Sequence, residues 1–202
     1  MAFLSDYIKD QGLVKSPDVQ GAFKALRQMS TASRDRGMRI AEILLETVPQ
    51  PSAEQIAFGM IAGTPAVGSF ARVMHNSLIQ KKFSDAARDL AERWAHHVNE
   101  TGICMNLPGA VLRQIMLASQ TARLEMAFDA YINGNSAETR EELALAWNEG
   151  FECIKYMGSV GPEALTEKLK TALLLAEPVA THYFKGQTPV KTRDFLARIL
   201  PQ

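Results

Sequence analysis

The sequence predicts an all-α protein, a compact multi-helix bundle of about eight to ten helices around one central helix. Nearly every segment of the 202 residues repeats its apolar side chains at the helical period. No stretch shows the alternation of β-branched residues that is typical of a strand. With 47% hydrophobic and 22% charged residues, the chain is long enough to bury a core without disulfides or a metal.

The central helix is expected over residues 108–133. Pro108 suits the first turn of a helix, and Gly134 suits the C′ position beyond its end. On a helical wheel this segment carries two opposite apolar stripes. The first holds Val111, Ile115, Ala122, Met126 and Ala130, and the second holds Leu117, Leu124, Phe128 and Tyr131. A helix with two apolar stripes packs on both sides, so we expect the other helices to surround it.

Proline and glycine residues separate the helices that are expected before the central helix. Residues 1–15 are expected to form a short helical arm that packs on the body or on a neighbouring subunit. Ser16-Pro17 pairs an N-cap with an N1 proline and opens a helical stretch to Val48. Small residues weaken its apolar pattern at 30–37, which indicates either a break between two helices or one helix in close contact there.

Further helices follow on both sides of the central one. Ser52 and Gln55 have the spacing of a capping box and open a short apolar helix through Ile61. Two more helices are expected, from Pro65 to about Gln80 and from Ser84 to Thr101. Beyond the central helix, one helix begins at Ser136 and ends at Gly158, and another begins at Gly161-Pro162 and is interrupted at Pro178. A last helix from about Pro189 to Leu200 buries Phe195, Leu196 and Ile199 and forms a C-terminal arm over residues 187–202.

Global properties place few limits on function. Residues 1–202 are expected to form a single domain because no long linker divides them. The formal charge is zero, with 22 basic and 22 acidic residues, so the net charge does not indicate any class of partner. The N-terminus lacks the pattern of a signal peptide and no apolar run is long enough to span a membrane, so a cytoplasmic protein is the expectation.

A basic cluster is the strongest local feature. Arg27, Arg34, Arg36 and Arg39 lie close together, with Lys24 before them. Arginine binds phosphate and carboxylate through its planar fork, so the cluster suits a phosphate-bearing ligand, a nucleic-acid backbone or an acidic partner. The alternative is a solvated helix face with ion pairs to Glu42 and Glu46. Acidic residues gather later in the chain, between residues 138 and 152, and this polarity suits either head-to-tail subunit contact or two ordinary helix surfaces.

Arg113, Gln120 and Arg123 form a polar seam between the two stripes of the central helix. Buried polar groups need partners, so the seam indicates either a pocket for an anionic ligand or a salt-bridge network with glutamates of neighbouring helices.

The remaining reactive side chains predict no catalytic centre. His96 and His97 share a helix with Glu92 and Glu100, but they lack the spacing of a carboxylate metal site, so a polar face is expected. His75 and His182 are expected to be buried and hydrogen-bonded. Cys153 is expected in the core, and Cys104 in a loop. No phosphate-binding loop or nucleophile elbow occurs.

We therefore expect no catalytic residue, metal or cofactor, and a protein that works by binding. The first hypothesis is self-association or binding to a protein partner. The second is a protein that coats nucleic acid without reading sequence, through the basic cluster. The third is a helical enzyme or small-molecule sensor with an anionic-ligand pocket beside Arg113 and Arg123.

Overall fold

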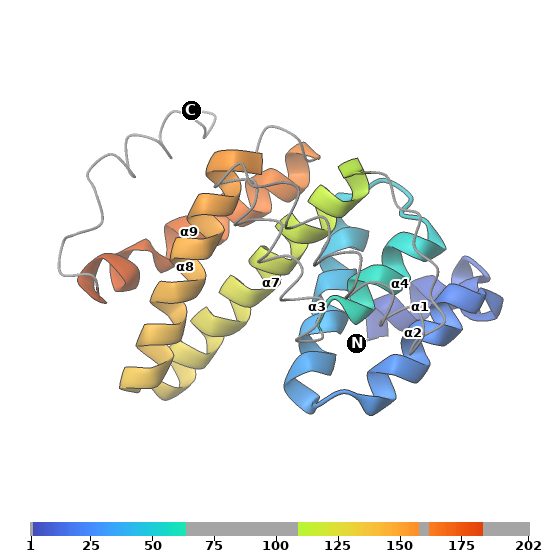
Figure 1. Ribbon diagram of the computed structural model, residues 1–202, viewed down its shortest axis with the longest axis horizontal. Coiled ribbons are helices and arrows are strands. Elements are labelled where there is room, and N and C mark those ends of the chain that lie inside the picture. Colours follow the sequence, from blue (N-terminus) through green and yellow to red (C-terminus); the bar gives the residue numbers. More distant parts are fainter. Residues whose placement is uncertain (1, 64–108, 158–161, 184–202) are drawn as a thin grey trace, which may run out of the picture.

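The computed structural model describes residues 2–63, 109–157 and 162–183, and within these ranges it contains helices and no strand (Figure 1). The all-α prediction is confirmed. The α-helices are α1 (Ala2–Asp10), α2 (Pro17–Gln28), α3 (Thr31–Thr47), α4 (Ala53–Ile61), α7 (Gly109–Gly134), α8 (Ala137–Met157) and α9 (Glu163–Tyr183), with a 3-10 turn at Leu13–Lys15. None of the helices in these ranges has the length and apolar character that crossing a membrane requires.

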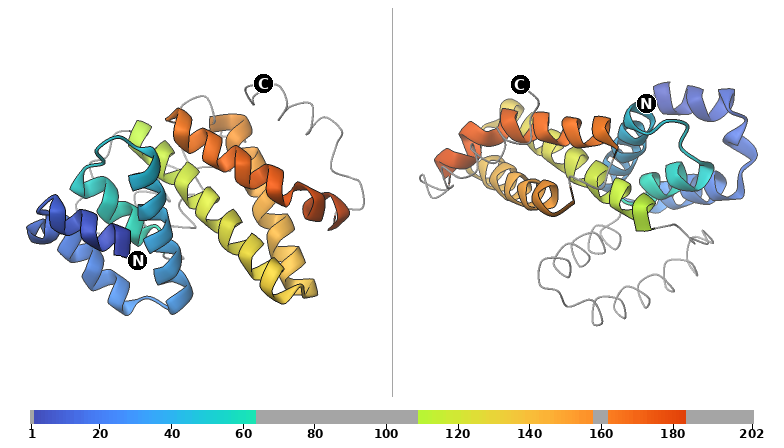
Figure 2. Two further views of the ribbon diagram at one scale, coloured as in Figure 1. Left: turned by 180° about the vertical axis from the view of Figure 1, so that it is seen from behind. Right: turned by 90° about the horizontal axis from the view of Figure 1, so that it is seen from above.

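Helix α7 lies at the centre of the described fold. It packs against α3 and α4 on one side and against α8 and α9 on the other (Figures 1 and 2). Both predicted stripes contribute to the core, because Ile115 and Ala122 of one and Leu117 and Leu124 of the other are buried. The central helix was therefore predicted correctly.

The C-terminal end of α7 differs from the prediction in one detail. Gly134 is the last helical residue, and Asn135 after it takes the left-handed conformation with φ 41°. The backbone N–H of Asn135 donates to the carbonyl of Tyr131 at 2.7 Å. Asparagine is among the few residues besides glycine that tolerate this backbone region, which explains why the helix runs one residue further than expected.

The sequence offered two interpretations of the weak apolar pattern at 30–37, a break between helices and a close helix contact. The structure shows both. Helix α2 ends at Gln28, and Ser30 then caps α3 by accepting a hydrogen bond from the Ser33 N–H at 3.3 Å. Further along, α3 makes a close contact with α4. A Cβ atom on Gly37 would overlap the carbonyl oxygen of Met60, so only glycine allows the two backbones to approach this closely.

The other helices of the N-terminal part follow the sequence signals. The Ser52 N–H donates to Gln55 Oε1 at 2.7 Å and the Gln55 N–H donates to Ser52 Oγ at 3.2 Å, which completes the predicted capping box of α4. Helix α1 packs on α3 of its own chain and buries Leu4 and Ile8.

Helices α8 and α9 form an antiparallel pair beside α7. Ser136 and Thr139 cap α8 through reciprocal bonds of 2.9 and 3.2 Å, as their spacing predicts. The indole N–H of the buried Trp147 donates to the carbonyl of Leu173 at 2.9 Å and so ties α8 to α9.

The predicted interruption at Pro178 is wrong, because α9 continues through it to Tyr183. A proline removes the hydrogen bond to the carbonyl four residues earlier, here that of Leu174. Pro178 and Leu174 both lie on the exposed side of α9, where water can bind that carbonyl. The helices expected at 65–80, 84–101 and 189–200 lie outside the described residues.

Replacing Gly37 with alanine is expected to lower the free energy of unfolding by about 1–3 kcal/mol, because the added methyl group forces α3 away from α4. Gly134→Ala is the matched control. Its Cβ would lie 3.6 Å from a methyl group of Thr139, an ordinary contact, and alanine favours helix by up to about 1 kcal/mol. Urea unfolding of both variants checks this; equal stability of Gly37→Ala and the wild type would contradict the close contact.

Candidate functional site

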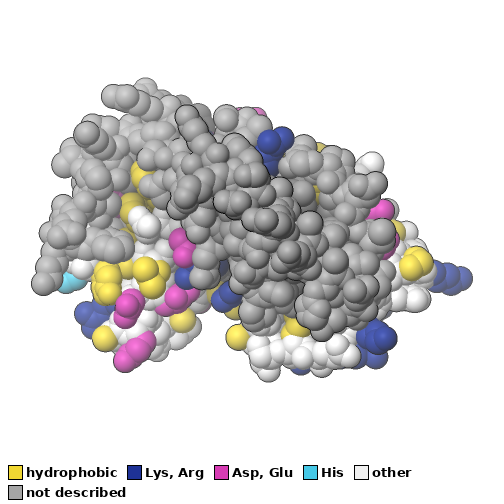
Figure 3. Space-filling view, viewed as in Figure 1, with side chains coloured by type: hydrophobic (Ala, Val, Ile, Leu, Met, Phe, Trp, Pro, Cys, Tyr) yellow, Lys and Arg dark blue, Asp and Glu magenta, His cyan; other side chains and the backbone are white. Residues whose placement is uncertain are grey.

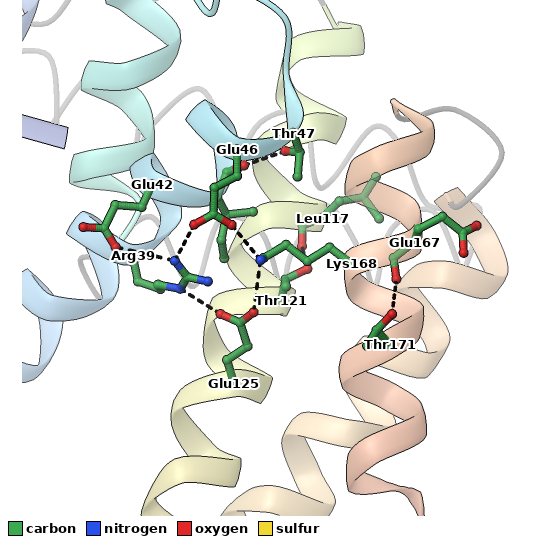
Figure 4. A network of polar contacts seen from close by, with 11 residues as sticks. Arg39, Glu42, Glu46, Thr47, Leu117, Thr121, Glu125, Glu167, Lys168 and Thr171 are labelled. Carbon is green, nitrogen blue, oxygen red and sulfur yellow. Dashed lines mark hydrogen bonds and ion pairs between the residues drawn. The ribbon is translucent and has the colours of Figure 1, made fainter. Parts of the chain in front are cut away.

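Arg39 joins α3 to α7 through a cluster of carboxylates (Figure 4). Its Nε donates to Glu125 Oε2 of α7 at 2.8 Å. Its Nη1 donates to Glu46 Oε1 at 2.9 Å and lies 3.5 Å from Glu42 Oε2, both on α3. The ion pairs to Glu42 and Glu46 are those expected if this part of the basic cluster forms intramolecular pairs, and the pair to α7 adds a tertiary link.

Lys168 of α9 binds the same carboxylates from the other side. Its Nζ lies 2.6 Å from Glu46 Oε2 and 3.7 Å from Glu125 Oε1. Glu46 and Glu125 are therefore each shared by two cations, and one network joins α3, α7 and α9 (Figure 4). Arg39 and Lys168 supply the cations of this network, and Glu42, Glu46 and Glu125 supply its carboxylates.

Partial burial and ion pairing shift the pKa values of Arg39 and Glu46 in this network. Desolvation alone would lower the pKa of Arg39, but hydrogen bonds and charge interactions with Glu125 and Glu46 raise it overall. Desolvation alone would raise the pKa of Glu46, but hydrogen bonds from Lys168 and Arg39 hold it below its ordinary value of 4.5. The Arg39 guanidinium is thus already occupied by carboxylates of its own chain.

A groove of about 440 Å³ opens beside the network. It is lined by residues of α3, α7 and α9: Arg39, Leu124, Glu125, Phe128, Asp129, Ala172 and Leu175. Leu124 and Ala172 are buried and form an apolar floor, while the Leu175 side chain stands 59% exposed at the edge. Asp129 is exposed and has no ion pair within the described ranges, so the charged lining residues, Arg39, Glu125 and Asp129, carry one negative charge in excess.

The arginines of the predicted basic cluster make different contacts in the structure. Arg27 is exposed on α2, and Arg36 is half-buried on α3. Arg34 donates from Nε to the Leu26 carbonyl at 3.3 Å and from Nη2 to the Met29 carbonyl at 3.5 Å, so it binds the C-terminal end of α2. Arg39 belongs to the network with Glu125.

The three residues of the polar seam on α7 also differ from one another in their contacts. Arg123 donates from Nε to Glu142 Oε1 at 3.0 Å and from Nη1 to Glu149 Oε2, which ties α7 to α8. This arrangement is the salt-bridge network with a neighbouring helix that the sequence offered as one interpretation. Arg113 Nε and Gln120 Oε1 are buried and have no hydrogen-bond partner among the described residues.

The remaining candidates give no reactive centre in the described ranges. His182 is exposed at the end of α9, which corrects its expected burial: it follows the last buried position, Ala180, by half a turn. Cys153 is buried as predicted, and burial raises its pKa to about 12, so the thiol stays protonated. No group of three His, Cys, Asp or Glu in the described part could hold a metal ion. His75, His96, His97 and Cys104 lie outside it.

Charge is distributed unevenly along the molecule. On the visible face, Asp and Glu side chains lie at the end where α7 joins α8, with a basic side chain beside them, and Lys and Arg side chains lie over the middle and at the opposite end (Figure 3). Glu138, Glu141 and Glu142 are exposed on the first turns of α8, and Lys24 and Arg27 are exposed on α2. These residues of the basic and acidic segments are therefore exposed to solvent on different helices.

Comparison of the chain with protein-family models, with curated proteins and with solved structures gives no match. The groove itself was missed in the sequence. Glu125 and Asp129 are spaced i, i+4 on the central helix between its apolar stripes, which was a signal for a shared acidic face. Nothing in the sequence indicated that Lys168 and Leu175 would lie beside them.

The network predicts a loss of stability in acid. Because the pKa of Glu46 is lower in the folded than in the unfolded chain, its charge contributes stability above 4.5, and this contribution disappears as the pH falls through the folded value. Glu46→Gln should therefore be less stable than the wild type at pH 7, by less than about 1 kcal/mol because the pair is partly screened by solvent. The difference should shrink towards pH 3.

Urea unfolding at both pH values measures this difference. Glu141→Gln, at an exposed position of α8, is the matched control and should leave the unfolding free energy unchanged. A loss for Glu46→Gln that is equal at pH 7 and pH 3 would show that the substitution acts through packing and not through its charge.

Proposed function

We propose that this protein is a non-enzymatic binding protein and that its binding surface is the groove between α3, α7 and α9. The bound element is a helical segment of a protein, from a partner or from another copy of the chain. One observation carries the proposal: an exposed leucine, Leu175, stands over a buried apolar floor beside the Asp129 carboxylate, which has no ion pair in the described part.

The apolar part of the groove favours side chains over a polar ligand. Removing apolar surface from water is favourable by about 25 cal/mol per Å², so covering Leu175 and Phe128 provides binding free energy without leaving a polar group unsatisfied. A groove that lies between helices and has an apolar floor suits an amphipathic helix, whose anchors recur at i, i+3 and i+4.

The acidic rim sets the charge of the partner. Among the residues that line the groove, the carboxylates of Glu125 and Asp129 outnumber the Arg39 guanidinium, an excess of one negative charge. Complementary charge speeds encounter and disfavours partners of the wrong sign. The partner we propose therefore carries apolar anchors flanked by lysine or arginine.

The same charge count gives less support to the two other hypotheses. An anionic ligand in this groove would meet excess negative charge, because Arg39 and Lys168 are both engaged by carboxylates. Arg123 is likewise paired with Glu142 and Glu149. A nucleic-acid backbone would find only part of the basic cluster on one surface, since Arg34 binds the end of α2 and Arg39 binds α7.

A labelled synthetic helix with leucine anchors and lysine flanks is the probe, and an isomer with glutamate in place of lysine is its control. Fluorescence anisotropy with the full chain should show binding of the basic peptide and at least tenfold weaker binding of the acidic one. Leu175→Asp should abolish binding, because it places a charge in the apolar contact. Asp129→Lys should weaken it, because it removes the complementary charge.

Leu145→Asp and Glu141→Lys are the matched controls. Both positions are exposed on α8, and the Leu145 side chain is 44% exposed, so the fold should tolerate these changes as it tolerates those at Leu175 and Asp129. Neither lines the groove. Binding that is lost equally in the control variants, or that ignores the sign of the peptide charge, would contradict the proposal.

A further inference from the structure

We infer that this protein associates head to tail with a second copy of itself, with the 3-10 turn at Leu13–Lys15 of one copy in the groove between α3, α7 and α9 of the next. Val14 is the apolar anchor of the turn, and Lys15 is the cation that pairs with Asp129 of the next copy. The inference rests on the proposed function, because it names a second copy of the chain as the partner of that groove.

Exposed apolar side chains of the molecule differ in the charge around them. Within the described residues, the large apolar side chains that stand exposed are Phe3, Val14, Ile132, Leu145, Leu174, Leu175 and Tyr183. Ile132 lies one turn beyond Asp129 on α7, and Leu145 lies among the exposed glutamates of α8. Phe3 lies one turn before the exposed Asp6 on α1. A groove with excess negative charge disfavours all three of these as anchors.

Val14 differs from them because a cation follows it. Its side chain is 50% exposed, and the neighbouring Lys15 is exposed and has no ion pair among the described residues. Consecutive Cα atoms lie about 3.8 Å apart, so the turn presents an apolar anchor and a positive charge side by side. The groove has the complementary pair, because Leu124 and Ala172 form its apolar floor and Asp129 supplies a carboxylate without an ion pair in the described part.

Local hydrogen bonds hold the turn in one conformation before it binds. Gly12 has a φ of 66°, a left-handed conformation that glycine adopts without strain. The Ser16 N–H donates to the Leu13 carbonyl at 2.9 Å, and Gln20 Nε2 donates to the Val14 carbonyl at 3.1 Å. Because the turn is already ordered, it loses little conformational entropy on binding, and more of the contact free energy contributes to affinity.

The position of the turn requires a second copy. The turn connects α1 to α2, and these helices lie on the far side of α3 from α9 (Figures 1 and 2). The groove therefore receives the turn of another molecule. A symmetric contact of groove against groove is disfavoured, because it would bring two Asp129 carboxylates together. A contact between two different surfaces leaves one turn and one groove free after each addition, so assembly continues beyond the dimer.

The size of the contact sets its strength. A single turn in a groove covers less than the roughly 1,200 Å² at which stable interfaces begin, so this contact belongs with the weak and transient ones. We therefore expect species larger than the monomer at high protein concentration, and their dissociation on dilution.

Sedimentation equilibrium of the full chain over a series of concentrations tests the contact. Val14→Asp removes the anchor and keeps the groove, whereas Leu175→Asp damages the groove and keeps the turn. The wild type should form dimers and larger species. Each variant alone should need at least about tenfold higher concentrations to associate, because an interface depends on its few anchors. An equimolar mixture of the two variants should form a one-to-one dimer and nothing larger, because it retains one intact turn and one intact groove per pair.

Lys15→Glu is a second turn variant, which keeps the anchor and reverses the charge, and it should also lose association. Phe3→Asp and Leu145→Asp are the matched controls. Both remove exposed apolar side chains outside the turn and the groove, so both should associate as the wild type does. Circular dichroism and the thermal midpoint establish that each variant remains folded.

The labelled basic helix of the proposed function separates the two proposals. A wild type that stays monomeric at every concentration but binds this helix would overturn the self-association and leave the groove as a binding site. Association that persists in Leu175→Asp, or a mixture of the two variants that gives no dimer, would overturn the head-to-tail contact in the same way. No binding of the helix by the wild type or by Val14→Asp would overturn both proposals.

Discussion

The shared carboxylates of Glu46 and Glu125 hold together the part of the molecule on which the candidate site depends. Each carboxylate binds Arg39 from α3 and Lys168 from α9 at the same time. These side chains are partly exposed, so each pair contributes little stability by itself. Their role is to fix the spacing of three helices around one groove, and the carboxylates of Glu125 and Asp129 give that groove its negative charge.

In the central helix α7, one set of residues packs in the core and another set faces the groove. Leu117 and Leu124 of α7 are fully buried and join the core on both sides. The polar positions between the stripes, Glu125 and Asp129, face the groove instead. Because α3 and α9 make few direct backbone contacts, α7 and the ion pairs set the distance between them. A surface of this kind can bind a partner without any change in the core.

The sequence was sufficient wherever a signal was local. The two stripes predicted the central helix, and Ser52 with Gln55 predicted the start of α4, because caps and periodicity involve residues within one or two turns. Pro178 was misjudged because its exposure, which spares the helix, depends on packing. The groove could not be predicted, since Arg39 and Glu125 meet across 86 positions of sequence. From its residue type alone, Arg39 was a candidate for binding phosphate. The fold shows that carboxylates of the same chain, Glu46 and Glu125, bind it instead.

The groove at Leu175 is proposed to bind an apolar, basic helix. The most direct measurement is the nuclear Overhauser spectrum of the methyl-labelled full chain mixed with the synthetic helix that carries leucine anchors and lysine flanks. Binding in the groove predicts cross-peaks between the Leu175 methyl groups and the peptide, and none at the Leu145 methyl groups. Leu175 methyl groups that show no cross-peak to the peptide, and that a water-soluble paramagnetic agent broadens as strongly in the mixture as in the free protein, would contradict this binding.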